Sequence, residues 1–136
     1  MIVELTNNAA QTVAVGDTVI FNTKLFSSGS CGCCCSRNGR FARLTKGGPY
    51  RISISANITT GTAGATAQLT VNAGGEPLPE MVLRAVSTAA GDNYTVSRST
   101  IYPNCCKEVT HITVTNTGTV PVVIAANPTL IISKEE

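Results

Sequence analysis

The sequence predicts a single all-β domain, a jelly-roll β-sandwich that spans residues 1–136. Helical periodicity is nearly absent, and short runs of alternating apolar and polar residues recur along the chain, separated by Gly, Pro and Asn. About nine or ten such runs are present, which is the strand count of two sheets facing each other across one core. A chain of 136 residues is the usual size of one domain.

An immunoglobulin-type sandwich is the rival architecture. In that fold a buried Trp typically packs against a disulfide, and this chain contains no Trp. We therefore expect the jelly roll.

The first predicted strand covers residues 19–26 and places Val19, Phe21 and Leu25 on one side, because successive side chains of a strand alternate between its faces. A short strand at 41–45 follows it. Both segments are rich in the apolar and β-branched residues that strands favour.

The clearest predicted strand lies in PYRISISANIT, residues 49–59, after the turn signal GGP. Its residues Ile52, Ile54, Ala56 and Ile58 fall on one face, and the residues between them fall on the other. The alternation predicts a strand with one face in the core.

The next run, residues 67–73, alternates strictly and ends at the turn signal Gly74-Gly75. Prolines at 121 and 128 confine their neighbours to strand starts, edges or bulges. Loops are indicated by composition at 60–64 and 89–93. The remaining predicted strands are residues 81–87, 94–102, 108–116, 120–125 and 130–133.

The charge content argues against two classes of partner. Charged residues make up 13% of the chain and the formal net charge is +2, without a cluster of Lys and Arg, so we expect no nucleic-acid partner. No apolar window is long enough to span a membrane, and the start MIVELTNNAAQTV lacks the pattern of a secretory signal. We therefore expect assembly in a cytosol, where thiols are normally reduced.

Six cysteines form two clusters. The segment SSGSCGCCCSRNGR contains Cys31, Cys33, Cys34 and Cys35, and YPNCCKE contains Cys105 and Cys106. In an extended segment the first, second and fourth thiols of the larger cluster point to one side and Cys34 to the other. Three sulfurs and a fourth from the smaller cluster have the composition of a tetrahedral zinc site, so the candidate metal ligands are Cys31, Cys33, Cys35, Cys105 and Cys106.

Three interpretations of the cysteines remain open. The first is a structural metal, zinc or another ion that prefers thiolates. The second is a set of disulfides that also uses Cys34, and these would join different molecules if the two clusters lay on loops at opposite ends of the sandwich. The third is free cysteine acting as a small hydrophobic residue.

Catalysis is the weakest interpretation. A catalytic thiol needs a nearby base, and the single His of the chain, His111, is predicted to point outward because Ile112 and Val114 mark the inward face. We therefore expect no enzymatic activity.

Other polar and aromatic residues are isolated. The acids Glu76, Glu80 and Asp92 lie in or near turns, where solvated side chains are more common than calcium ligands. Tyrosines are able to stack on sugars, but in a sandwich they more often belong to the core or to an interface. These residues are Tyr50, Tyr94 and Tyr102.

The order of several segments resembles the trimeric jelly-roll superfamily of tumour necrosis factor and the complement globular heads, together with bacterial relatives at spore-surface tips and on phage fibres. The matching pieces are an opening strand with FNT, then GGPYRISISANIT, QLTVNAGGEPLP, VTHITVTNTG and the closing PTLIISK. The resemblance implies a TNF-like fold and a homotrimer. The cysteine clusters depart from that group.

These observations predict a non-enzymatic structural virion protein, a homotrimeric phage capsid decoration or a head or tail fibre knob, stabilised by its clustered cysteines. Its partners would be copies of itself and a capsid or fibre protein. The alternative is a receptor- or carbohydrate-binding tip with a glycan ligand, or a spore-surface protein of exosporium type.

Overall fold

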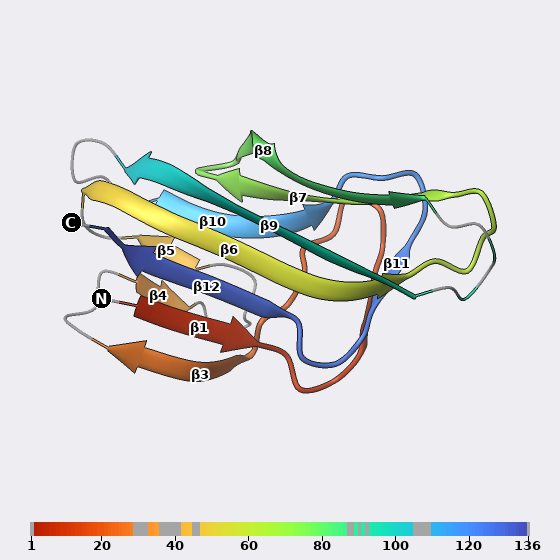
Figure 1. The fold of residues 1–136 in the computed structure, drawn as a ribbon, viewed down its shortest axis with the longest axis horizontal. Helices are drawn as coiled ribbons and strands as arrows, with labels where there is room; N and C mark the ends of the chain where they lie inside the picture. The colour runs from red at the N-terminus through yellow and green to blue at the C-terminus, as the bar shows by residue number, and fades with distance from the viewer. Residues whose placement is uncertain are drawn as a thin grey trace.

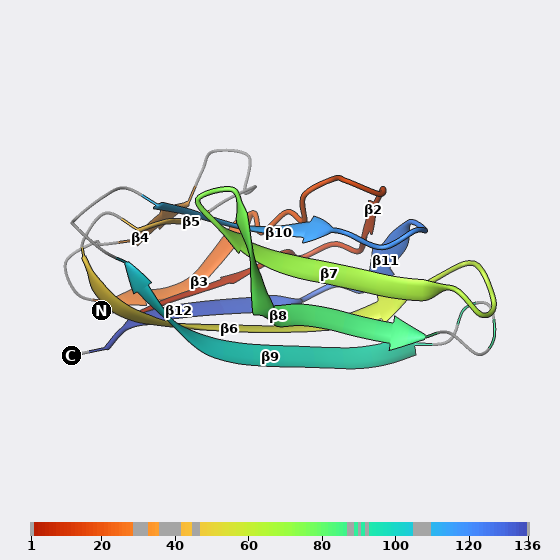
Figure 2. The same ribbon diagram turned by 90° about the horizontal axis from the view of Figure 1, so that it is seen from above.

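The structure is a computed structural model that describes residues 2–28, 33–35, 42–44, 47–86, 89, 91, 93–104 and 110–135. Within these residues the chain forms twelve β-strands and no helix, and the strands build two sheets that face each other (Figures 1 and 2). The described residues therefore contain no helix that could cross a membrane. The prediction of an all-β sandwich is confirmed.

The first sheet is organised around its longest central strand, β6. The strands β12 and β11 pair with one edge of β6, β9 pairs with the other edge, and β1 and β3 extend the sheet beyond β12. All of these pairs are antiparallel. The strands of this sheet are β1 (Ile2–Thr6), β2 (Gln11–Val13), β3 (Thr23–Ser28), β6 (Gly48–Thr59), β9 (Asn93–Asn104), β11 (Val122–Ile124) and β12 (Thr129–Lys134).

The second sheet has five strands in the order β4-β5-β10-β7-β8. Its two edge strands are therefore β4 and β8. The five strands are β4 (Cys33–Cys35), β5 (Ala42–Leu44), β7 (Thr66–Ala73), β8 (Glu76–Val86) and β10 (Thr110–Asn116). In the edge-on view of Figure 2, β8 and β9 lie beside each other where the two sheets approach.

The core lies between the sheets and consists of one cluster of buried apolar side chains. The alternation predicted for β6 is confirmed, because Ile52, Ile54, Ala56 and Ile58 are all at most 5% exposed. In such a sandwich every second side chain of a strand is buried between the sheets, and this burial is the main source of stability.

The hairpin between β7 and β8 follows directly from its sequence. Ala73 pairs with Glu76, so Gly74 and Gly75 alone form the turn, with φ of 61° and 86°. Two consecutive positive φ values are typical of a type I′ turn, whose twist matches that of the flanking strands, and glycine adopts them without steric cost. The turn predicted at Gly74 and Gly75 is therefore confirmed.

The predicted strand at 19–26 is wrong in two respects. The regular strand starts only at Thr23, although Val19 and Phe21 are buried as expected. Leu25 was expected to point inward and is 53% exposed. The register explains this result: Glu4 pairs with Phe26 and Leu5 with Lys24, so Leu25 is the extra residue of a β-bulge and leaves the alternation.

The strand predicted at 81–87 begins earlier, at Glu76. Pro77 and Pro79 lie within it, which is possible because β8 is an edge strand and needs ladder hydrogen bonds on only one side. Prolines 121 and 128 immediately precede β11 and β12, as expected of strand starts. Three-residue strands such as β2 and β4 are too short to show alternation, so the sequence predicted fewer strands than the chain has.

Candidate functional site

The larger cysteine cluster contributes a strand rather than only a loop. Cys33–Cys35 form β4, which pairs with β5 so that Cys33 lies opposite Leu44 and Cys35 opposite Ala42. The expectation that both clusters lie on inter-strand loops is therefore wrong for these three residues. Their side chains, and Cys31, Cys105 and Cys106, lie outside the described part of the structure, so the choice among metal, disulfide and free thiol stays a prediction.

The strand residues that flank the two clusters meet at one end of the sandwich. Cys33, Leu44 and Thr110 form one row across β4, β5 and β10. The buried Thr110 Oγ1 donates a 2.7 Å hydrogen bond to Oδ1 of the buried Asn104, the residue before Cys105 in the chain. In Figure 1 this end also carries both termini.

Among the described residues no group of three or more His, Cys, Asp or Glu side chains is placed to hold a metal ion. Glu76 and Glu80 are exposed on β8, and Asp92 lies outside the described residues.

His111 lies on the outward face of β10, as predicted, between the buried Ile112 and the first residue of the strand. Its cross-strand neighbour is Arg43, which in turn lies opposite Cys34. The backbone of His111 is thus two strand spacings from that of Cys34, about 10 Å, with a cation between them. This register does not resemble a thiol beside a general base.

The tyrosines belong to the core and its margin. Tyr50 is 0% exposed, so it has no face for a sugar ring, and the stacking role raised for it is wrong. Tyr94 and Tyr102 are half-buried and pack against the core cluster. The core interpretation is correct for Tyr50, and the role of the exposed parts of Tyr94 and Tyr102 stays a prediction.

The outward face of the first sheet has mostly small hydroxyl side chains at its centre, and Arg98 is the one charged residue among those that line it. Its central positions on β6, β9 and β12 form a shallow depression of about 390 Å³, and we call this surface the serine face. Around it, Arg51 is paired with Glu135 at 2.9 Å, and Glu4 is half-buried. The residues that line the serine face are Ser53, Ile54, Ser55, Ser97, Arg98, Ser99, Thr129 and Ile131.

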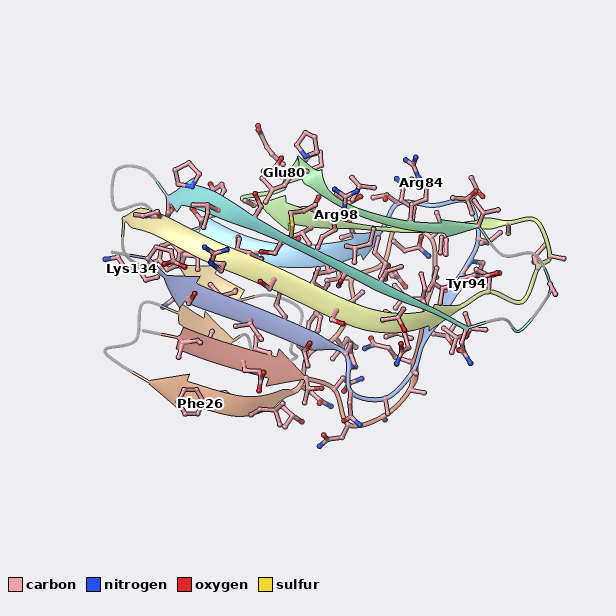
Figure 3. The ribbon with its side chains drawn as sticks, in the orientation of Figure 1. Phe26, Glu80, Arg84, Tyr94, Arg98 and Lys134 are labelled. Carbon is pink, nitrogen blue, oxygen red and sulfur yellow. The ribbon has the colours of Figure 1, made fainter. Side chains whose placement is uncertain are left out.

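A second hollow of about 570 Å³, the arginine groove, lies between β8 and β9, which belong to different sheets and share no strand ladder. Side chains rather than backbone pairs cross this seam: Arg98 Nη1 donates to the Glu80 carbonyl at 3.4 Å, and Thr100 Oγ1 to Glu80 Oε1 at 3.5 Å. Figure 3 shows Arg84 and Arg98 on this edge of the molecule. Residues lining the groove include Pro79, Val82, Arg84, Thr95, Ser97 and Arg98.

The sequence analysis missed the arginine groove. Arg84 and Arg98 lie in alternating runs and resemble ordinary solvated positions, and only the approach of two strands from different sheets brings them to one hollow.

No protein-family model and no curated protein sequence matches the chain. Solved structures do. Eiger TNF from S. frugiperda superposes with a TM-score of 0.79 at 10% identity, over 100% of this chain and 92% of that one. Murine APRIL at pH 5.0 gives a TM-score of 0.70 at 11% identity, over 98% of both chains.

A third similar structure is PRD1 vertex protein P5, with a TM-score of 0.59 at 14% identity, over 99% of this chain and 96% of that one. Identities this low establish the fold alone. The chain is a TNF-like jelly roll, as the resemblance in its sequence predicted, and its function has to be argued from its own surfaces.

Proposed function

We propose that the chain is a non-enzymatic structural protein that assembles as a homotrimer on the surface of a virus particle, as a phage capsid decoration or a fibre knob. The observation that carries the proposal is the serine face. It is open to solvent in the single chain, and it is built mostly from small side chains, with Arg98 as the one charged residue that lines it.

Small uncharged side chains allow two sheets to approach closely without desolvating ions, which is the costly step in forming an interface. The two longest strands that carry this face, β6 and β9, have 12 residues each and are therefore about 40 Å long. A stable interface buries about 800 Å² per partner, so the proposed contact would extend over several of these strands.

The fold comparison supports a role on a particle without assigning one. A viral vertex protein, PRD1 P5, shares this fold, and so do two structures of the TNF type. The proposed location is therefore the virion, with assembly in the host cytoplasm.

The oligomeric state is the direct test. Light scattering after size exclusion should give three times the 14.1 kDa chain mass. Ser55→Arg introduces a charge into the centre of the serine face and should yield monomers that retain the β-sheet circular dichroism spectrum. The control is Ala63→Arg, which adds the same charge on an exposed loop and should stay trimeric. A wild-type monomer at micromolar concentration would refute the proposal.

The cysteines are proposed to fasten the end of the sandwich where β4, β5, β9 and β10 meet. The candidate ligands are Cys31, Cys33, Cys35, Cys105 and Cys106. The row from Cys33 to Thr110 and the hydrogen bond from Thr110 to Asn104 support a link within one subunit.

The two proposed forms of the cysteine link, a zinc site and disulfides, give different masses. Native mass spectrometry of a zinc-bound form shows about 65 Da of added mass per ion that a chelator removes, as expected of a structural thiolate site. A disulfide form has lost two hydrogens per bridge and regains them with reductant. If the mass is the same with and without chelator and reductant, and all six thiols are alkylated in the native protein, the proposed cysteine link is refuted.

A further inference from the structure

The seam between β8 and β9 brings together two cations from different sheets. Arg84 comes from β8 of the five-stranded sheet and Arg98 from β9 of the seven-stranded sheet, and both line the arginine groove. Both residues are exposed, so their charges are accessible from solvent.

Neither guanidinium is neutralised by a carboxylate. Arg84 Nε donates at 3.0 Å to Gln68 Oε1, and Arg98 Nη1 donates to a backbone carbonyl. Within the described residues the one ion pair is that of Arg51 and Glu135, at the other side of the sheet. Each arginine is thus oriented by one neutral hydrogen bond and keeps its other N–H donors for a ligand.

The rest of the lining selects the chemistry of that ligand. Ser97 provides an exposed hydroxyl group on β9, and the Thr95 hydroxyl, which already donates to Asn57 Oδ1 at 2.6 Å, offers its oxygen as an acceptor. Pro79 and Val82 provide small apolar surfaces on β8. No aromatic side chain occurs among the described residues that line the groove. Stacking of a nucleobase or of a neutral sugar ring therefore has no platform there, and binding has to come from charge and hydrogen bonds.

We propose that the arginine groove binds an acidic saccharide, with a carboxylate or a sulfate ester between Arg84 and Arg98 and its hydroxyl groups on Thr95 and Ser97. Guanidinium groups bind such oxyanions through pairs of parallel hydrogen bonds. The hydroxyl-lined wall of β9 suits a polyhydroxy ligand better than a bare ion. A chain with a net charge of only +2 would not hold a long polyanion by charge alone, so the site should be local.

The test is a titration of the intact protein with two fluorescent probes, a heparin-derived hexasaccharide that carries sulfate and a hexa-galacturonate that carries carboxylate. A neutral maltohexaose is the negative probe. Binding of either acidic probe supports the site and identifies which oxyanion it prefers. Equal binding of the neutral probe, or no binding of both acidic probes at millimolar concentration, would overturn it.

Variants locate the site. Arg84→Gln and Arg98→Gln should each weaken binding about 10-fold or more, the usual effect of removing a charge-assisted hydrogen bond. Lysine keeps the positive charge but lacks the planar set of N–H donors of a guanidinium. Arg84→Lys and Arg98→Lys should therefore bind more tightly than the glutamine variants and more weakly than the wild type. The matched control is the double variant Lys24→Gln with Arg43→Gln, which removes two exposed charges elsewhere on the two sheets. If this control loses as much affinity as Arg84→Gln with Arg98→Gln, the attraction is non-specific, and the proposed saccharide site in the groove is refuted.

The same variants separate a ligand site from a subunit contact. Light scattering should give the same mass for Arg84→Gln, which changes the groove but not the serine face, as for the wild type. A lower mass would mean that a second copy of the chain occupies the groove, and it would overturn the saccharide proposal while leaving the homotrimer intact as a hypothesis.

Discussion

Replacing Asn116 with alanine should destabilise the protein far more than the exposed polar sequence around it suggests. Asn116 is 1% exposed at the end of β10. Its Nδ2 donates to the carbonyl oxygens of Val13 at 2.9 Å and Val120 at 3.0 Å, and its Oδ1 accepts from the Gly118 amide at 3.0 Å. One side chain thereby joins β2, the end of β10 and the loop before β11.

The magnitude follows from these three bonds. A typical hydrogen bond contributes about 1 kcal/mol net, and carbonyls left dry and unpaired add to the loss, so Asn116→Ala should cost about 3 kcal/mol. The unfolding entropy is about 2.1 cal/mol/K per residue, so for this chain length the loss corresponds to a fall in Tm of roughly 10 °C. Asn116→Asp, which places an oxygen against two carbonyl oxygens, should cost at least as much.

The assay is urea denaturation followed by circular dichroism, at a protein concentration held constant because assembly also affects apparent stability. The matched control is Asn57→Ala on the exposed face of β6, where the side chain accepts a single 2.6 Å bond from Thr95. We expect a loss below about 1 kcal/mol there. Equal losses for the two alanine variants would refute the inference that the buried asparagine holds three segments together.

Two further predictions concern the turn and the surface ion pair. Gly75→Ala should cost roughly 1–2 kcal/mol, because Gly75 has φ of 86° with open space around it, so the cost comes from the backbone alone. Gly61→Ala, where no positive φ is required, should be neutral in the same denaturation assay, and equal effects at both sites would contradict the type I′ turn. Arg51→Ala should change stability by less than about 1 kcal/mol, because both partners of its ion pair are 40% exposed or more. A larger loss that persists at high salt would show that the pair is protected from solvent in an assembly.

The parts of the fold that the sequence predicted are those where local chemistry and tertiary packing agree. The alternation in β6 and the turn at Gly74 and Gly75 each have one plausible structure, and both are confirmed. Leu25 shows the opposite case. Its place in an apolar run predicts burial, but a bulge against β1 shifts the register by one residue, and no local signal in the run marks that bulge.

The burial of polar residues in β7 was also not predicted from the sequence. Thr70 and Asn72 occupy the polar positions of the alternating run in β7, yet they are 3% and 8% exposed. Asn72 forms side-chain hydrogen bonds with Thr113 and Thr115 of β10. Thr70 forms one with Thr117, the residue that follows β10. A single sequence shows these residues as solvated because the hydrogen-bond partners that permit burial lie on another strand.

The low identity to the similar structures indicates where function has to be sought. At 10% identity and a TM-score of 0.79, the shared property is the fold, and core positions tolerate exchange among residues of similar volume. Ile52, Ile54 and Ile58 therefore specify the sheet and carry no information about a partner. The outward rows have no such constraint from the core, so a shallow surface of small hydroxyl side chains and a groove with two arginines that form no ion pair require an explanation outside folding. Ser97 and Arg98 line both hollows, so the variants that separate them are at Ser55 and Arg84. If the serine face is a subunit interface, Ser55→Arg should change the mass of the particle while leaving saccharide binding per chain unaltered, and Arg84→Gln should do the reverse. A variant that altered both measurements would mean that the two surfaces form a single contact.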